Sequence, residues 1–225
     1  MTIQPSLTIL IGSFARGTAE HFSDIDIVRV GHHHALSKSV LRQFGNPRSP
    51  VSYIDYDGTT FESLYKSGSL FIHHVLTEGK LIEGNLAYWS DLRKRFLVLE
   101  DFSNEIQEQL SLCVWLSRPE VFANAVLPQL SHTFRALKNA GIFMLAQNRI
   151  YIYDKRRALK KAFRFLSKDD IEVLLIANNS YERGLLDASV SVSELSSLLP
   201  RLSARIKTGV EELLWHGTER HSLRN

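Results

Sequence analysis

The sequence predicts an α+β protein, with a mixed β-sheet and helices in residues 1–90 and an all-α helical bundle in residues 91–225. Two observations predict this division. Short β-prone runs are concentrated in the first part and almost vanish after about residue 90, where apolar residues instead recur every three or four positions. The first pattern is typical of strands and the second of amphipathic helices that bury their apolar stripes together.

Three strands are expected in the first part. LTILI is a continuous apolar run that ends at a glycine, whereas DIDIVRV and VSYIDY alternate between polar and apolar residues. A polar turn or short helix should follow the first strand, and a single helix should follow the third and end at Gly79. The ranges are 7–11, 24–30 and 51–56 for strands, 13–19 for the turn, and 38–44 and 60–78 for helices.

Helices are expected throughout the second part. In 102–116 and 122–145 the apolar residues follow helical spacing, and three later segments continue the pattern. Those segments lie around 159–166, at 169–179 and at 191–214. Several amphipathic helices without strands predict a bundle.

The composition is that of an ordinary globular protein. The 225 residues are 44% apolar and 23% charged, with a net charge of +3 and one cysteine, Cys113, so no intrachain disulfide can form. No apolar run approaches the roughly 18–20 residues of a membrane span, and the N-terminus lacks the pattern of a signal peptide. We therefore expect a cytoplasmic protein with no membrane partner. The small positive charge permits a nucleic-acid or acidic partner without requiring one.

One constellation points to chemistry. Gly12-Ser13 stands at the end of the first strand, and Asp24-Ile25-Asp26 follows ten residues later at the start of the second. Two aspartates two positions apart on a strand point to the same side, and paired carboxylates suit Mg²⁺ ions that also bind phosphate oxygens. Gly12 permits close backbone approach, while the Ser13 hydroxyl and nearby N–H groups can bind phosphate. The alternative is a surface strand with two exposed aspartates beside an ordinary turn.

The segment ILIGSFARGTAEHFSDIDIV resembles the signature of the polymerase-β-like nucleotidyltransferase superfamily. The GSxARG and SDIDIV details are similar to its minimal-nucleotidyltransferase branch, which includes antibiotic nucleotidyltransferases and antitoxins paired with HEPN-type toxins. FESLYKSGSLFIHHVLTEGKLI also resembles the helix after the third strand, so the resemblance covers roughly residues 7–85. It implies a nucleotidyltransferase-type mixed sheet.

The resemblance also implies roles for individual residues. Asp24 and Asp26 would ligate two Mg²⁺ ions, and Ser13 would contact the β- or γ-phosphate of a nucleoside triphosphate, with ATP the first candidate. Arg16 would contact the triphosphate or else be a surface arginine. Asp55 would be the third carboxylate, as a metal ligand or general base. The neighbouring Asp57 would serve the turn before Gly58.

Two functions follow as hypotheses. The first is an Mg²⁺-dependent enzyme that moves a nucleoside monophosphate from an NTP to a hydroxyl and releases pyrophosphate. Its acceptor would be a protein side chain, an RNA end or a small molecule. The alternative is a catalytically weak nucleotide-binding or partner-binding module, for example an antitoxin-like regulator.

Two further features lie outside the motif. Residues 155–168 contain seven Lys or Arg and no acid. They are interpreted either as a solvated helix face or as a surface for RNA or an acidic protein. His32, His33 and His34 are interpreted as solvent-facing loop residues near the rim of the site.

Overall fold

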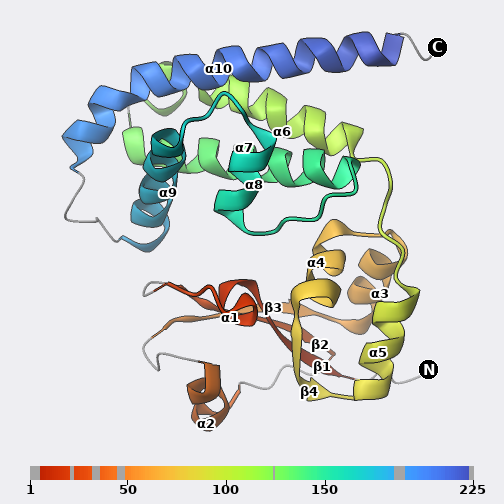
Figure 1. Cartoon of the computed structure of the whole chain (residues 1–225). Helices are drawn as coiled ribbons and strands as arrows, with labels where there is room; N and C mark the ends of the chain where they lie inside the picture. The colour runs from red at the N-terminus through yellow and green to blue at the C-terminus, as the bar shows by residue number, and fades with distance from the viewer. Residues whose placement is uncertain are drawn as a thin grey trace. The chain divides into compact units, whose positions relative to one another are not determined.

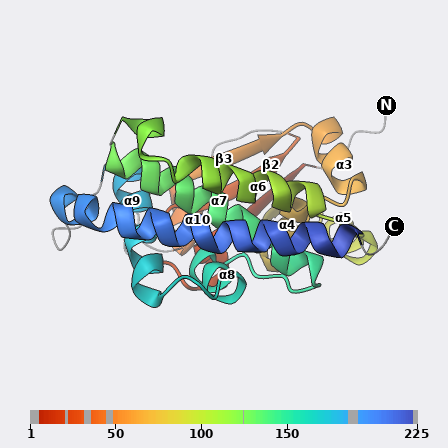
Figure 2. The same ribbon diagram turned by 90° about the horizontal axis from the view of Figure 1, so that it is seen from above.

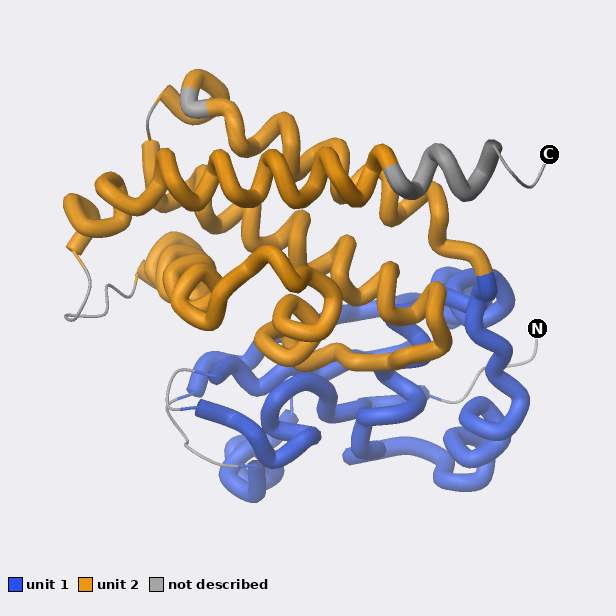
Figure 3. The backbone as a smooth tube through the Cα atoms, turned by 45° about the horizontal axis from the view of Figure 1, so that its top comes forward, with its two compact units in different colours: residues 1–100 blue, residues 101–225 orange. Residues whose placement is uncertain are grey.

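The chain forms two compact units in a computed structural model that describes residues 6–20, 23–31, 36–44, 49–123, 125–184 and 191–222. The units are Met1–Glu100 and Asp101–Asn225 (Figure 3). The first contains a sheet and helices and the second is helical, so the protein is α+β. The first unit continues past the expected boundary near residue 90, because helix α5 (Leu86–Arg95) packs within it. The run His32–His34 lies outside the described residues.

A four-stranded mixed sheet, ordered β3-β2-β1-β4, organises the first unit (Figure 1). Strand β1 runs antiparallel to β2 and β4, whereas β2 and β3 are parallel. The first three strands match the predicted runs, but β4 was not predicted, because its two adjacent apolar residues give no period-two pattern. The bounds are Leu7–Ile11 for β1, Ile25–Val30 for β2, Val51–Tyr56 for β3 and Lys80–Gly84 for β4.

The two faces of the sheet pack against different helices. Face A carries Ile9 and Val28 and packs against helices α3, α4 and α5. Face B carries Leu10 and Ile27 and packs against helices α1 and α2 and the 3-10 turn that follows. Strand residues with the parity of Val28 therefore point to face A, and those with the parity of Ile27 to face B. These helices are α1 (Gly12–Arg16), α2 (Lys38–Leu41), α3 (Gly58–Lys66) and α4 (Leu70–Glu78), and the turn is Arg42–Phe44.

The helix expected over 60–78 is two helices, α3 and α4. They separate at Gly68, which has a left-handed φ of 69° and lies so close to the chain at 97–99 that a Cβ would come within 2.5 Å of the Leu99 nitrogen. Asp57 caps α3, because its side chain accepts a hydrogen bond from the Thr60 N–H at 2.7 Å. This confirms the expectation that Asp57 stabilises the turn before the helix. The end at Gly79 is also confirmed.

The second unit is built around α7 (Val126–Gln147), which contacts all of the other long helices there. Figures 1 and 2 show α10 running alongside α6. The expected start of α7 at residue 122 is wrong, since residues Pro119–Phe122 form a 3-10 turn, and the basic helix α8 ends earlier than residue 166. The remaining bounds are α6 Ser103–Leu116, α8 Lys155–Ala162, α9 Lys168–Arg183 and α10 Val192–Ser222.

The core of the second unit is apolar and includes the cysteine. Leu137, Leu159 and Leu174 are completely buried, and so is Cys113, whose thiol pKa is raised to about 12 because burial disfavours the thiolate. Within the described ranges no helix is both long and apolar enough to cross a lipid bilayer.

Candidate functional site

A sharp corner joins the first strand to the first helix. β1 ends at Ile11 and α1 begins at Gly12, which has a left-handed φ of 70°. Glycine adopts this conformation without the steric cost that a Cβ imposes. The residue before the helix, Ile11, supplies no side-chain cap for the first N–H groups of α1.

The Asp26 carboxylate lies directly against this corner. The antiparallel register pairs Ile11 with Asp26. A Cβ placed on Gly12 would lie 2.6 Å from Asp26 Oδ2, which is too close for any real contact. The absence of a side chain at Gly12 therefore allows a half-buried carboxylate to rest beside the backbone of the corner. We refer to Gly12, Ser13 and Asp26 as the corner site.

Asp24 stands just before the strand that carries Asp26. It is half-buried, and continuing the alternation of β2 places it on the side of Asp26. Ile25 and Ile27, which point to face B, are buried in the apolar core. The arrangement expected from the sequence, two acids on one side and two isoleucines on the other, matches this burial pattern.

The Ser13 hydroxyl is available at the corner. It makes no hydrogen bond within the part of the chain that the structure describes, and the residue is half-buried. Its backbone carbonyl accepts from the Thr18 N–H at 2.9 Å, which fixes the turn that closes α1. A hydroxyl with no internal partner can donate to a phosphate oxygen.

Arg16 at the end of α1 is already held by an acid. Its Nη1 donates to Glu78 Oε2 on α4 at 2.8 Å, and His74 Nε2 lies 3.2 Å from the same oxygen. Burial alone would raise the pKa of Glu78, but the interactions with His74 and Arg16 outweigh it and keep the pKa below its usual range. Contact between Arg16 and a triphosphate would therefore have to compete with Glu78.

Asp55 does not share a face with Asp26. The parallel register pairs Asp55 with Arg29, and both residues have the parity of face B. Arg29 donates to both carboxylate oxygens of Asp55, each at 2.7 Å, and its guanidinium lies 4.0 Å from the centre of the Tyr53 ring. The hydrogen bonds that Arg29 donates to Asp55, opposed by burial, raise the pKa of Arg29. This placement does not fit the expected third carboxylate, and it corrects that assignment.

Ser52 occupies the β3 position beside Asp26. The register pairs the two residues, so they point to the same face, and the other face A residues of β3 are Ile54 and Tyr56. β3 thus offers no acid on this side. In agreement, no group of three or more His, Cys, Asp or Glu that could hold a metal ion occurs among the described residues.

Sequence reasoning missed three residues that bear on the expected site: Arg29, which holds Asp55, Ser52, which pairs with Asp26, and Glu78, which holds Arg16. The first had a visible signal, because the polar positions in DIDIVRV shift parity between Asp26 and Arg29. That shift places Arg29 on the face opposite to Asp26. The positions of Ser52 and Glu78 depend on strand register and helix packing, which no local pattern gives.

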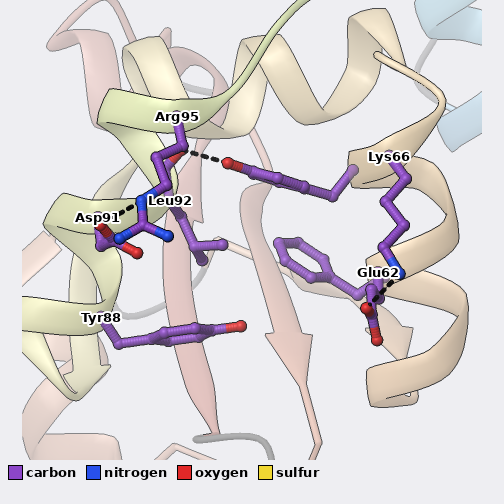
Figure 4. A pocket seen from close by; sticks show the side chains of 8 residues that line it. Glu62, Lys66, Tyr88, Asp91, Leu92 and Arg95 are labelled. Carbon is purple, nitrogen blue, oxygen red and sulfur yellow. Dashed lines mark hydrogen bonds and ion pairs between the residues drawn. The ribbon is translucent and has the colours of Figure 1, made fainter.

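A separate pocket of about 230 Å³ lies between α3 and α5 (Figure 4). Phe61, Tyr65 and Tyr88 form its aromatic lining. The charges at its rim are paired within their own helices, Lys66 with Glu62 at 2.6 Å and Arg95 with Asp91 at 2.8 Å. The pocket includes no corner-site residue.

Comparison with known proteins gives no identity. No protein-family model matches the chain, and no curated protein matches it at a significant level.

The Arg29–Asp55 pair is expected to stabilise the fold. Asp55→Asn leaves the buried Arg29 charge poorly compensated, and we expect a loss of about 1–2 kcal/mol in the free energy of unfolding, reduced by the exposure of Asp55. Asp91→Asn, which breaks an exposed pair, should cost about 0.5 kcal/mol or less. Urea denaturation measures both. An Asp55→Asn variant of unchanged stability would contradict the structural role of the pair.

Proposed function

We propose that this chain is an Mg²⁺-dependent nucleotidyltransferase that moves a nucleoside monophosphate from an NTP, ATP first, to a hydroxyl acceptor. The observation that carries the proposal is the close approach of the Asp26 carboxylate to the Gly12 backbone, next in sequence to Ser13. The mixed sheet, with its glycine-serine corner next to an aspartate pair, also supports a nucleotidyltransferase-type fold and the resemblance to the polymerase-β-like superfamily.

The donor set fits the metal. Asp24 and Asp26 would hold Mg²⁺, because hard cations take carboxylate oxygens and keep room for phosphate. When bound, the metal supplies positive charge that offsets the charge of the triphosphate. The Ser13 hydroxyl and the backbone of the corner would orient the phosphates, so that the protein contributes mainly positioning.

The reaction exchanges one bond for another. The acceptor oxygen forms a bond to the α-phosphorus, the bond from the α-phosphorus to the bridging oxygen breaks, and pyrophosphate leaves with that electron pair. The acceptor proton passes to solvent or to a carboxylate of the site. Acceptors in keeping with this chemistry are a protein side chain, an RNA end or a small molecule.

A second candidate function is favoured by one observation. Ser52, which cannot act as a third carboxylate, stands beside Asp26 on β3. A site with two carboxylates could bind a metal–nucleotide complex and turn it over slowly. The chain would then be a nucleotide-binding or partner-binding module, for example an antitoxin-like regulator.

A transfer assay distinguishes these candidates. Wild-type protein is incubated with Mg²⁺, each of four α-labelled NTPs, and either total cell protein or total RNA. We expect label in one acceptor pool and a loss of at least about 100-fold in Asp26→Asn, because removing a charge that neutralises the transition state is costly. Glu83→Gln on β4 is the matched control, an exposed acid of the same sheet whose neutralisation should leave transfer unchanged.

Each other outcome has a defined meaning. Transfer at the wild-type rate by Asp26→Asn would contradict the assignment of the site. No label from wild-type protein with any acceptor, together with NTP binding that Asp26→Asn abolishes, would favour the binding module.

The two glycines that bracket α1 provide a second test. Gly12 and Gly17 have nearly equal left-handed φ values of 70° and 72°, so alanine should cost about 1 kcal/mol of stability at either position. Only at Gly12 would the new Cβ meet a carboxylate; at Gly17 nothing lies within 4 Å. We expect Gly12→Ala to rotate the Asp26 carboxylate away and weaken binding of Mg²⁺ with a non-hydrolysable ATP analogue at least about tenfold.

Calorimetry of both variants measures this difference. Gly17→Ala should bind the analogue as the wild type does. Equal weakening in the two variants, or in neither, would show that the Gly12–Asp26 contact does not serve nucleotide binding.

A further inference from the structure

Helix α8 presents a uniformly basic surface. Arg157, Lys160 and Lys161 are exposed and follow the i, i+3, i+4 spacing that places residues on one side of a helix. Ala158 and Leu159 are completely buried on the other side. Arg164, just beyond the helix end, is also exposed. We refer to Arg157, Lys160, Lys161 and Arg164 as the basic face.

The charges of the basic face are not neutralised by the protein. Within the described part of the chain, its four side chains make no ion pair and no hydrogen bond. Their neighbour Arg156 differs, since it pairs with Glu172 of α9 at 2.8 Å. A solvated helix face commonly alternates charges of both signs. Residues 155–168 contain no acid, and Asp154, the cap of α8, lies just before them in the sequence.

Further cations lie nearby on α7, where Arg135 is paired with Glu182 of α9. Lys138 makes no ion pair among the described residues. Its pKa is lowered first by burial and then by two charged neighbours, Arg135 and Lys155, which are both cations. A lysine that is partly desolvated beside cations is stabilised when an anion binds nearby.

The character of the basic face favours a nucleic acid over a protein partner. Protein interfaces are anchored by buried aromatic or aliphatic side chains, and their centres are depleted of charge. In 155–168 the exposed residues are cations and one serine, and no large apolar side chain is exposed. Interfaces with nucleic acids are more polar and more positively charged than those between proteins.

We propose that the basic face binds the sugar–phosphate backbone of RNA. The choice of RNA rests on the proposed function, because an RNA end supplies the acceptor hydroxyl. Contacts of Lys and Arg with phosphates carry little sequence information, so binding should tolerate many sequences and weaken with salt. The second unit would thereby hold the acceptor molecule.

Binding of a fluorescein-labelled single-stranded RNA of mixed sequence, followed by anisotropy across a KCl series, tests this proposal. The test variant is Arg157→Gln/Lys160→Gln/Lys161→Gln/Arg164→Gln. The matched control is Lys38→Gln/Lys94→Gln/Arg201→Gln/Lys207→Gln, four exposed cations on other elements that also make no ion pair in the described structure. Both variants lower the net charge equally.

We expect the test variant to bind RNA at least about tenfold more weakly at 100 mM KCl. The slope of log K against log salt concentration should also become shallower by about three, because each lost phosphate contact with a single strand contributes about 0.7 to that slope. The control should stay close to wild type. Equal losses in both variants, or none in either, would overturn the proposal. The proposal would also be overturned if wild-type protein bound an all-glutamate peptide more tightly than RNA.

The assay separates this proposal from the proposed function. It contains neither NTP nor Mg²⁺, and Asp26→Asn should bind RNA as the wild type does. Transfer without RNA binding would remove the RNA proposal alone, and RNA binding without transfer would remove the proposed activity alone. Thermal melts check that the variants fold. If the quadruple variant does not fold, Lys160→Gln/Lys161→Gln replaces it, and half the change in slope is then expected.

Discussion

The close approach of the Asp26 carboxylate to the Gly12 backbone is the contact on which the candidate site depends. It requires three things together: a strand register that pairs Ile11 with Asp26, a corner with left-handed φ, and a residue without a Cβ. Ser13 follows Gly12 at this corner. Carboxylates bind hard cations and backbone N–H groups bind phosphates, and the proposed function rests on this combination.

Strand parity determines the remainder of the site. The same offset in register pairs Asp26 with Ser52 and Arg29 with Asp55, so the two aspartates point to opposite faces. Asp55 therefore compensates a buried guanidinium, and a serine stands beside the candidate metal ligands. On α4, Glu78 holds Arg16 and lies close to His74. These interactions limit which side chains can reach a nucleotide.

Much of the fold could be predicted from the sequence, but long-range placement could not. Local patterns located β1, β2, β3 and most helices, because alternation and helical spacing reflect one buried face. The break between α3 and α4 at Gly68 was missed because it depends on a tertiary contact. The chain at 97–99 occupies the space that a Cβ on Gly68 would need. Gly12 and Asp26 stand out in the sequence because the corner and the strand carry local signals. Asp55 was misplaced because register between strands is a tertiary property, although the parity shift at Arg29 gave a clue.

The central claim is that Asp24 and Asp26 hold a metal ion against a nucleotide at the Gly12 corner. The most direct measurement is anomalous diffraction from crystals grown with Mn²⁺ and a non-hydrolysable ATP analogue. The account predicts an anomalous peak within bonding distance of the Asp26 carboxylate, with the phosphates of the analogue beside Gly12 and Ser13. A peak elsewhere, or an analogue bound away from this corner, would contradict it.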